Sequence, residues 1–112
     1  MTEHIPEQIA AMAALEAKAN VQEYNYPPKP LSRLDADIRV TYTGVCATDL
    51  HMIDNDWELS RYPLVPGHEV VGHVIAVGSG VKDLNVGDVV GLGALAQACG
   101  ECENCRDGID NL

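Results

Sequence analysis

The sequence predicts a mainly β protein with one or two short helices. Residues 37–43, DIRVTYT, alternate apolar and polar side chains with a period of two, which is typical of a strand with one buried face. Residues 70–77, VVGHVIAV, are apolar at odd and even positions alike, which indicates a strand buried on both faces or at a sheet junction. Residues 86–92, VGDVVGL, form another short apolar run beside turn residues and predict a further strand.

Composition limits both the size of the protein and its partners. A chain of 112 residues, 46% hydrophobic and 21% charged, predicts one small soluble domain at most. The net charge of −10 argues against nucleic acid or an anionic membrane as a partner. The sequence contains no run of about 18 apolar residues that could span a bilayer, and its first residues lack the pattern of a secretory signal. We therefore expect a cytoplasmic protein.

The N-terminal segment is open to two interpretations. Residues 9–19 are rich in Ala, Glu and Met, so helix propensity alone favours a helix there. Residues 21–26, VQEYNY, alternate and stop at a Pro-Pro pair, which predicts a strand. The first segment could equally be a buried strand that leads into the second, and local evidence favours neither.

The strand over residues 37–43 ends shortly before Cys46. Thr48 or Asp49 can cap a short helix that runs to about Ile53. On that helix Thr48 and His51 are three residues apart and share a face. The sequence thus predicts a strand, then a cysteine, then a short helix with a hydroxyl and an imidazole on one side.

Cys46 and His68 are the side chains most suited to binding a metal in this region. Thiolate and imidazole are preferred ligands of zinc, and a Pro-Gly pair fixes a turn immediately before His68. The two residues are too far apart in the sequence to meet through one helix or strand, so the fold must bring them together. Our hypothesis is that both bind a catalytic zinc. His73 would point to the opposite face of an extended segment and is predicted to be structural or exposed.

Three cysteines with the spacing C-x2-C-x2-C form a second candidate metal site: Cys99, Cys102 and Cys105. Structural zinc and an iron–sulfur cluster are the two main candidates for this spacing. A bacterial ferredoxin run would have a cysteine where Ile109 stands, which disfavours iron–sulfur. A disulfide with a spare thiol is a further alternative. A closed zinc site needs a fourth ligand, which Asp107, Asp110 or a residue beyond Leu112 would supply.

Three motifs in this order and spacing resemble the zinc-containing medium-chain alcohol dehydrogenases: GVCATDLH, GHEVVGHVIAVGSGV and the triple cysteine. The stretches HMIDNDW and YPLVPGHEVVGHV are similar to the cinnamyl-alcohol-dehydrogenase-like branch of that family. The likeness runs over about residues 36–112 and is weaker before. It implies a GroES-like catalytic domain with the start of a structural-zinc lobe at about residues 96–112. It also implies a strand pair in the N-terminal segment.

The resemblance also implies a role for each site residue. Cys46 and His68 would bind the catalytic zinc together with a second cysteine from later in a full-length chain, and Glu69 would join that coordination transiently. Asp49 would orient His68. The remaining roles are a proton relay through Thr48 and His51, a substrate pocket lined by Met52 and Trp57, and a structural zinc on Cys99, Cys102 and Cys105.

The implied activity is the interconversion of primary alcohols and aldehydes by hydride transfer with NADP(H) or NAD. No G-x-G-x-x-G follows a strand here, so we expect an N-terminal part of a longer, homodimeric enzyme that is inactive without the dinucleotide-binding domain. Ala47 departs from the family, since many relatives have a basic or imidazole side chain there. A zinc-stabilised binding domain without catalysis is the alternative.

Overall fold

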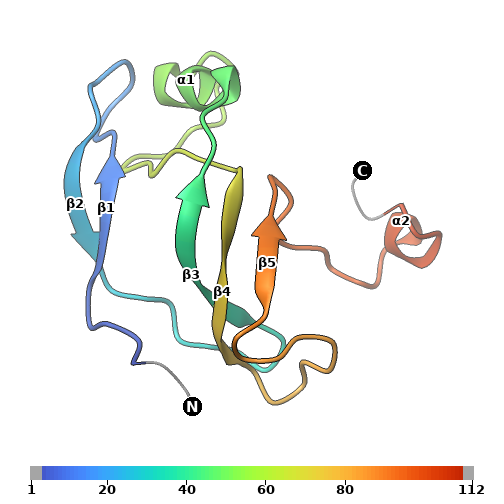
Figure 1. Ribbon diagram of the computed structural model, residues 1–112. Coiled ribbons are helices and arrows are strands. Elements are labelled where there is room, and N and C mark those ends of the chain that lie inside the picture. The colour runs from blue at the N-terminus through green and yellow to red at the C-terminus, as the bar shows by residue number, and fades with distance from the viewer. Residues whose placement is uncertain (1–3, 110–112) are drawn as a thin grey trace.

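The computed structural model describes residues 4–109 and confirms the prediction of a mainly β fold with short helices (Figure 1). Its elements are, in order, β1 (Ile9–Ala13), β2 (Gln22–Tyr26), β3 (Ala36–Thr43), α1 (Ala47–Asp54), β4 (Val70–Val77), β5 (Val89–Leu92) and α2 (Glu103–Arg106). The strands predicted over residues 37–43 and 70–77 are both present with nearly the predicted bounds. No helix in the described part of the chain is long and apolar enough to cross a membrane.

The strands form two antiparallel sheets. β1 and β2 make a two-stranded hairpin, and the other sheet has the order β3-β4-β5. Ala14, directly after β1, pairs with Leu64 in the loop before β4, with both N···O distances at 2.8 Å. Figure 1 shows α1 at one end of the strands, whereas α2 lies away from both sheets. The cysteines of the second candidate metal site therefore sit in a separate lobe.

The helix that propensity favours over residues 9–19 is wrong, and the strand pair implied by the family resemblance is confirmed. Ile9 pairs with Tyr26 and Ala13 with Gln22, so β2 supplies the backbone partners of β1. Ala13 and Ala14 are fully buried. A short isolated helix is marginal in water, so burial against neighbouring strands decides the conformation of this segment.

β4 is the central strand of the larger sheet, as its apolar pattern indicates. Val74, Ile75 and Ala76 are all buried, so both faces of the strand are covered at this point. β5 starts three residues later than the strand predicted over residues 86–92, and the turn expected at Asn85 and Gly87 precedes it. Within this turn the Asn85 amide donates to Asp88 Oδ2 over 2.9 Å.

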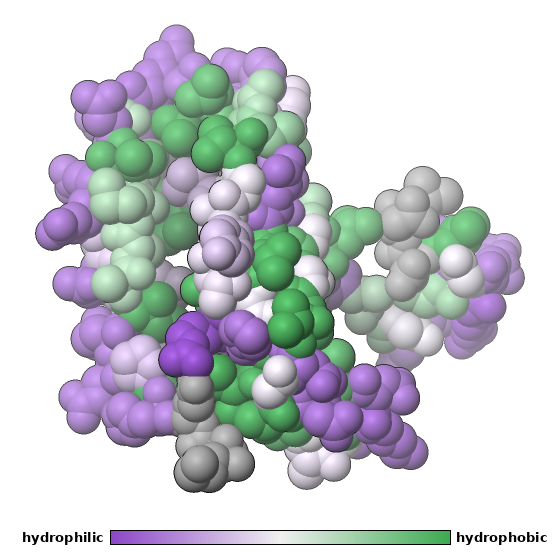
Figure 2. Space-filling model, in the orientation of Figure 1, coloured by the Kyte–Doolittle hydropathy of each residue, from purple (hydrophilic) through white to green (hydrophobic). Residues whose placement is uncertain are grey.

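Several large apolar side chains remain at the surface. Tyr42 on β3 is 76% exposed and Val89 on β5 is 67% exposed, whereas the buried apolar core is small. Figure 2 shows apolar side chains gathered at the surface around α1 and β5. The sheet is thus only partly covered by the described residues.

Asp35 tightens the turn that leads into β3, and its contribution to stability should depend on pH. Its Oδ2 accepts a hydrogen bond from the Ser32 amide at 3.1 Å and one from Lys29 Nζ at 3.3 Å. Hydrogen bonds from Ser32, and then the Lys29 ammonium, lower the pKa of Asp35. Because the pKa is lower in the folded state, the carboxylate stabilises the fold above its unfolded-state pKa, about 3.9. That stabilisation is lost as the pH falls through the lower folded-state value.

We therefore expect Asp35→Ala to lower the melting temperature at pH 7, and the difference from the parent to shrink below about pH 4. Thermal unfolding followed by circular dichroism between pH 2.5 and 7 measures this difference. Asp83→Ala, at an exposed aspartate before β5, is the matched control. A deficit that stays constant over the whole pH range would contradict the prediction.

Candidate metal centre

Cys46 lies in the short connection between the end of β3 and the start of α1. The Gly44 amide donates to the Glu69 carbonyl over 2.8 Å, which ties the end of β3 to the residues before β4. Cys46 is the N-cap residue of α1, with an extended backbone. The predicted caps, Thr48 and Asp49, are therefore wrong as N-cap residues. Asp49 instead sits one turn in, and its Oδ2 accepts from the Cys46 amide at 3.1 Å.

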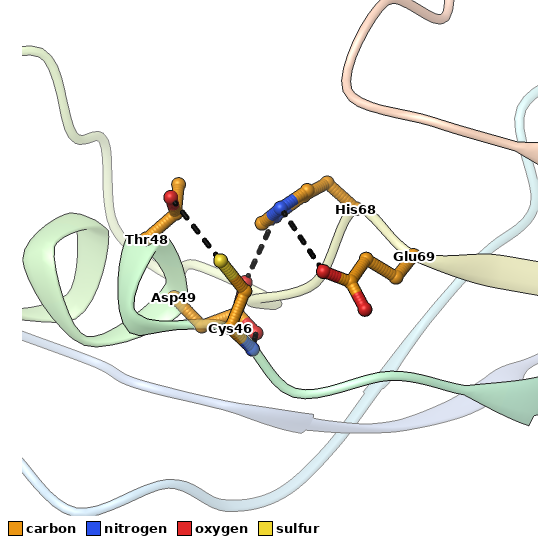
Figure 3. A network of polar contacts seen from close by, with 5 residues as sticks. All are labelled: Cys46, Thr48, Asp49, His68 and Glu69. Atoms are coloured by element: carbon orange, nitrogen blue, oxygen red, sulfur yellow. Dashed lines mark hydrogen bonds and ion pairs between the residues drawn. The ribbon is translucent and has the colours of Figure 1, made fainter.

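Asp49 joins the two segments that carry the candidate ligands. The residue is buried, at 9% exposure. While Oδ2 caps the start of α1, Oδ1 lies 3.1 Å from His68 Nδ1. A carboxylate only accepts hydrogen bonds, so Nδ1 of His68 carries the proton. His68 Nε2 is then the nitrogen left for a metal. Figure 3 shows the His68 ring in contact with Asp49 and Glu69.

The structure brings Cys46, His68 and Glu69 together as one group, which we call the Cys46 cluster. One ligand atom from each lies within 4.8 Å of those of the other two. His68 Nε2 is 3.9 Å from Glu69 Oε1, and Thr48 Oγ1 is 3.5 Å from the sulfur of Cys46 (Figure 3). A thiolate, an imidazole nitrogen and a carboxylate are a donor set that suits zinc. The residues present therefore fit the metal implied by the sequence.

Hydrogen bonds and charges around Cys46 favour its thiolate, which is the form that binds a metal. Hydrogen bonds from the hydroxyl and backbone of Thr48, together with the neighbouring His68, lower the pKa of the Cys46 thiol. For His68, burial opposes the charged ring, but the contact with Cys46 and the charge of Asp49 outweigh it and raise the pKa. Since zinc binds the thiolate, a lower thiol pKa reduces the competition from protons.

Gly44 leaves the space in which the Glu69 side chain lies. A Cβ at this position would collide with Glu69 Oε2 and would lie 3.0 Å from Glu69 Cβ. We expect Gly44→Ala to displace Glu69 and to destabilise the fold by about 1–3 kcal/mol, as overpacking does. Urea unfolding measures the change. Gly93→Ala is the matched control, because nothing lies within 4 Å of a Cβ there, and equal losses in the two variants would contradict the prediction.

The two residues of the expected proton relay lie on α1 in different surroundings. Thr48 faces the Cys46 cluster, whereas His51 is half-exposed and its Nδ1 lies 2.7 Å from Asp56 Oδ2. The ring of Trp57 packs on His51 with centroids 5.2 Å apart. Asp56 is a residue that the sequence analysis missed. Its position within two residues of the helix end was the available signal.

A cavity of about 280 Å³ opens beside His68 and Thr48. Of the two residues expected to line a substrate pocket, Met52 lines this cavity and Trp57 lies outside it, against His51. The sequence analysis missed most of the apolar wall, which comes from Leu64, Val65, Pro66 and Ala94. These residues reach the cavity only because the loop before β4 and the loop after β5 meet at this point.

The three remaining cysteines form the triple-cysteine cluster, namely Cys99, Cys102 and Cys105. Their sulfurs lie within 4.8 Å of one another, and those of Cys99 and Cys105 are 3.8 Å apart. Hydrogen bonds from the Glu101 and Cys102 amides lower the pKa of Cys99 to about 7. The neighbouring Cys102 raises the pKa of Cys105. The cluster thus offers closely spaced thiolates to a soft metal ion.

Other residues named from the sequence lie outside both clusters. His73 is in β4, paired with Arg39 and Val89, and joins neither group. Asp107 ends α2 and is not grouped with the three thiols, so the described residues supply three ligands to that cluster. Asp110, the other proposed fourth ligand within the chain, lies outside the described residues.

The protein is thus a small β domain with two candidate metal sites. One combines cysteine, histidine and a carboxylate, and the other is a separate lobe with three thiols. Residues 32–112 match the model of the alcohol dehydrogenase GroES-like domain. The chain belongs to this family, and the resemblance to zinc-containing medium-chain alcohol dehydrogenases is confirmed.

Individual relatives agree with this assignment. The chain is 51% identical to aldehyde reductase AdhA of Synechocystis over 93% of its length and 31% of the relative's. It is 40% identical to cinnamyl alcohol dehydrogenase 2 of Rauvolfia serpentina over 95% of its length and 29% of the relative's. The chain therefore spans about a third of the length of these relatives.

Solved structures show the same similarity. A cinnamyl alcohol dehydrogenase of Sorghum bicolor superposes with a TM-score of 0.87 at 40% identity, over 93% of this chain and 30% of that one. A Helicobacter pylori cinnamyl alcohol dehydrogenase in complex with NADP(H) gives a TM-score of 0.88 at 30% identity, over 94% and 30% of the two chains. The GroES-like fold is therefore confirmed.

Proposed function

We propose that the complete protein carrying this domain is a zinc-dependent oxidoreductase that interconverts primary alcohols and aldehydes by hydride transfer with NADP(H). One observation carries the proposal: the Cys46 cluster lies beside a cavity with an apolar wall that Thr48 and His68 also line. Such a site can hold a Lewis acid next to an alcohol whose carbon chain rests on apolar side chains.

Cys46 and His68 would hold the zinc in this proposal, with Glu69 as a ligand that can leave. A bound zinc ion supplies polarisation of the substrate oxygen. Asp49 keeps His68 in the tautomer with a free Nε2 and at the same time fixes the backbone of Cys46. The exposed Glu69 side chain, 3.9 Å from His68 Nε2, is the least constrained of the three.

Thr48 and His51 would move the proton between substrate and solvent. Thr48 is placed at the cluster and also lines the cavity, so its hydroxyl can contact a bound alcohol. The Asp56 carboxylate beside His51 Nδ1 can only accept, so that nitrogen carries a hydrogen and Nε2 has the free lone pair. His51 Nε2 would take up the proton and, from its half-exposed position, release it to water.

The names of the relatives support the substrate and cofactor classes. Several of the matched relatives are named as aldehyde reductase, mannitol dehydrogenase or cinnamyl alcohol dehydrogenase, and one solved neighbour is complexed with NADP(H). The largely apolar wall of the cavity favours an alcohol with an apolar chain. We assign no residue of this chain to binding the cofactor.

The test combines metal analysis with a hydride-transfer assay. We expect the complete protein to contain two zinc ions per subunit and to reduce NADP⁺ in the presence of a primary alcohol. We expect the 112-residue chain alone to bind zinc without turnover. Zinc binding with no oxidation of any alcohol by the complete protein would instead support a zinc-stabilised binding domain. Turnover by the isolated chain would contradict the expected need for a separate cofactor domain.

A further inference from the structure

The cavity beside His68 lies between two walls that are tied to each other at two points. α1 supplies Thr48 and Met52, which are one helical turn apart, and the segment before β4 supplies Leu64 and His68, which are four residues apart. The first tie is the contact between Asp49 Oδ1 and His68 Nδ1, at 3.1 Å. It holds the end of the cavity at which the proposed zinc would lie.

Tyr62 makes the second tie, at the end of the cavity that Met52 lines. Its hydroxyl donates to the Ile53 carbonyl at 2.6 Å and lies 3.4 Å from the Met52 carbonyl. Ile53 directly follows Met52 in α1, and Tyr62 stands two residues before Leu64. The last carbonyls of a helix have no partner within the helix, so they are available to this hydroxyl. One hydrogen bond thus joins the two walls directly.

The hairpin of β1 and β2 holds each wall separately. The backbone of Ala14 pairs with Leu64, and the Lys18 amide, in the connection between the two strands, donates to the Ile53 carbonyl over 3.1 Å. Two links that run through a third segment leave the walls able to pivot relative to each other. The Tyr62 hydroxyl removes this freedom, because it connects the walls without an intermediate segment.

We propose that Tyr62 is a positioning residue that fixes the width of the cavity at its Met52 end and so selects alcohols by the length of their carbon chain. The inference rests on the proposed function, in which the substrate oxygen binds at the Cys46 cluster. A short alcohol then lies beside His68 and does not reach the tied end. A longer alcohol extends between Met52 and Leu64, where its contacts depend on the separation of the walls, since dispersion attraction falls steeply with a widening gap.

The kinetic test uses Tyr62→Phe in the complete protein, which removes the hydroxyl and keeps the ring. We expect KM for cinnamyl alcohol to rise about threefold to tenfold, the equivalent of one ordinary hydrogen bond, with kcat retained. KM for ethanol should be unchanged. Tyr26→Phe, the same chemical change on β2 at a residue that does not line the cavity, is the control and should alter neither KM. Equal losses for the two alcohols, or no loss for either, would overturn the proposal.

The second test measures binding without catalysis. Ligand-observed NMR of the zinc-loaded complete protein, without NADP⁺, gives Kd for ethanol and for cinnamyl alcohol. Tyr62→Phe should raise Kd for cinnamyl alcohol about threefold to tenfold and leave Kd for ethanol and the zinc content unchanged. An unaltered Kd for cinnamyl alcohol would overturn the proposal even if the parent is active. If the parent showed this change in selectivity but transferred no hydride, the proposed function alone would fail.

Discussion

Cys46→Ser is expected to remove one of the two zinc ions of the complete protein and to lower kcat/KM at least about a thousandfold, because polarisation of an oxygen by a metal supplies several kcal/mol. A serine hydroxyl is a poor replacement for the thiolate that zinc prefers. In the structure the serine would also lack the favourable thiolate contacts with Thr48 and His68. Zinc content by mass spectrometry and the rate of NADP⁺ reduction measure the two effects.

Cys102→Ser is the matched control for that variant. It makes the same chemical change in the triple-cysteine cluster, so it should also cost one zinc ion. Its effect should fall mainly on stability, with activity retained in the protein that stays folded. If Cys46→Ser lost a zinc ion but kept its activity, the assignment of a catalytic metal to the Cys46 cluster would be wrong.

Asp49→Asn is expected to weaken zinc binding at the Cys46 cluster by about 10- to 100-fold, the usual cost of losing a partner of a metal-ligating histidine. Asp49 accepts two hydrogen bonds at once, from His68 Nδ1 and from the Cys46 amide. An amide has one oxygen acceptor, so one of these two groups must lose its partner. Titration against a chelator of known affinity measures the change.

The loss of zinc affinity should be specific to Asp49 and should not occur when another aspartate of α1 is changed. Asp54→Asn, at the far end of the same helix, is the control and should leave zinc affinity unchanged. We also expect Asp49→Asn to lower the melting temperature of the metal-free chain, because Asp49 is buried and caps α1. If Asp49→Asn lowered the melting temperature but left the zinc affinity unchanged, the role of Asp49 would be structural only.

The sequence predicted the central part of the fold well, because the signals there are local. The apolar run of β4 and the alternation in β3 each follow from the position of the strand in the sheet. Helix propensity failed for β1 because nothing in residues 9–13 reveals that β2 will provide a partner. Only the family resemblance indicated the strand pair.

For the site, residues recognised by type and motif could be predicted, whereas residues brought in by loops could not. Cys46, His68 and Glu69 could be chosen from residue type and motif, and the structure brings them together. Asp56 and the apolar cavity wall depend on how loops return to the helix, and a single sequence does not encode that in any short pattern. The family resemblance, and no local pattern, indicated Trp57 as a pocket residue, and in the structure its ring packs against His51.

The position of α2 has a consequence for how the two proposed zinc ions would bind. α2 makes no contact with any described strand, so its lobe does not share packing with the sheet that carries His68. The two ions should consequently enter and leave in any order, each with its own affinity and rate. Stepwise addition of a chelator should therefore remove the two ions in two separate steps. Protein with one zinc ion bound should be detectable between the two steps.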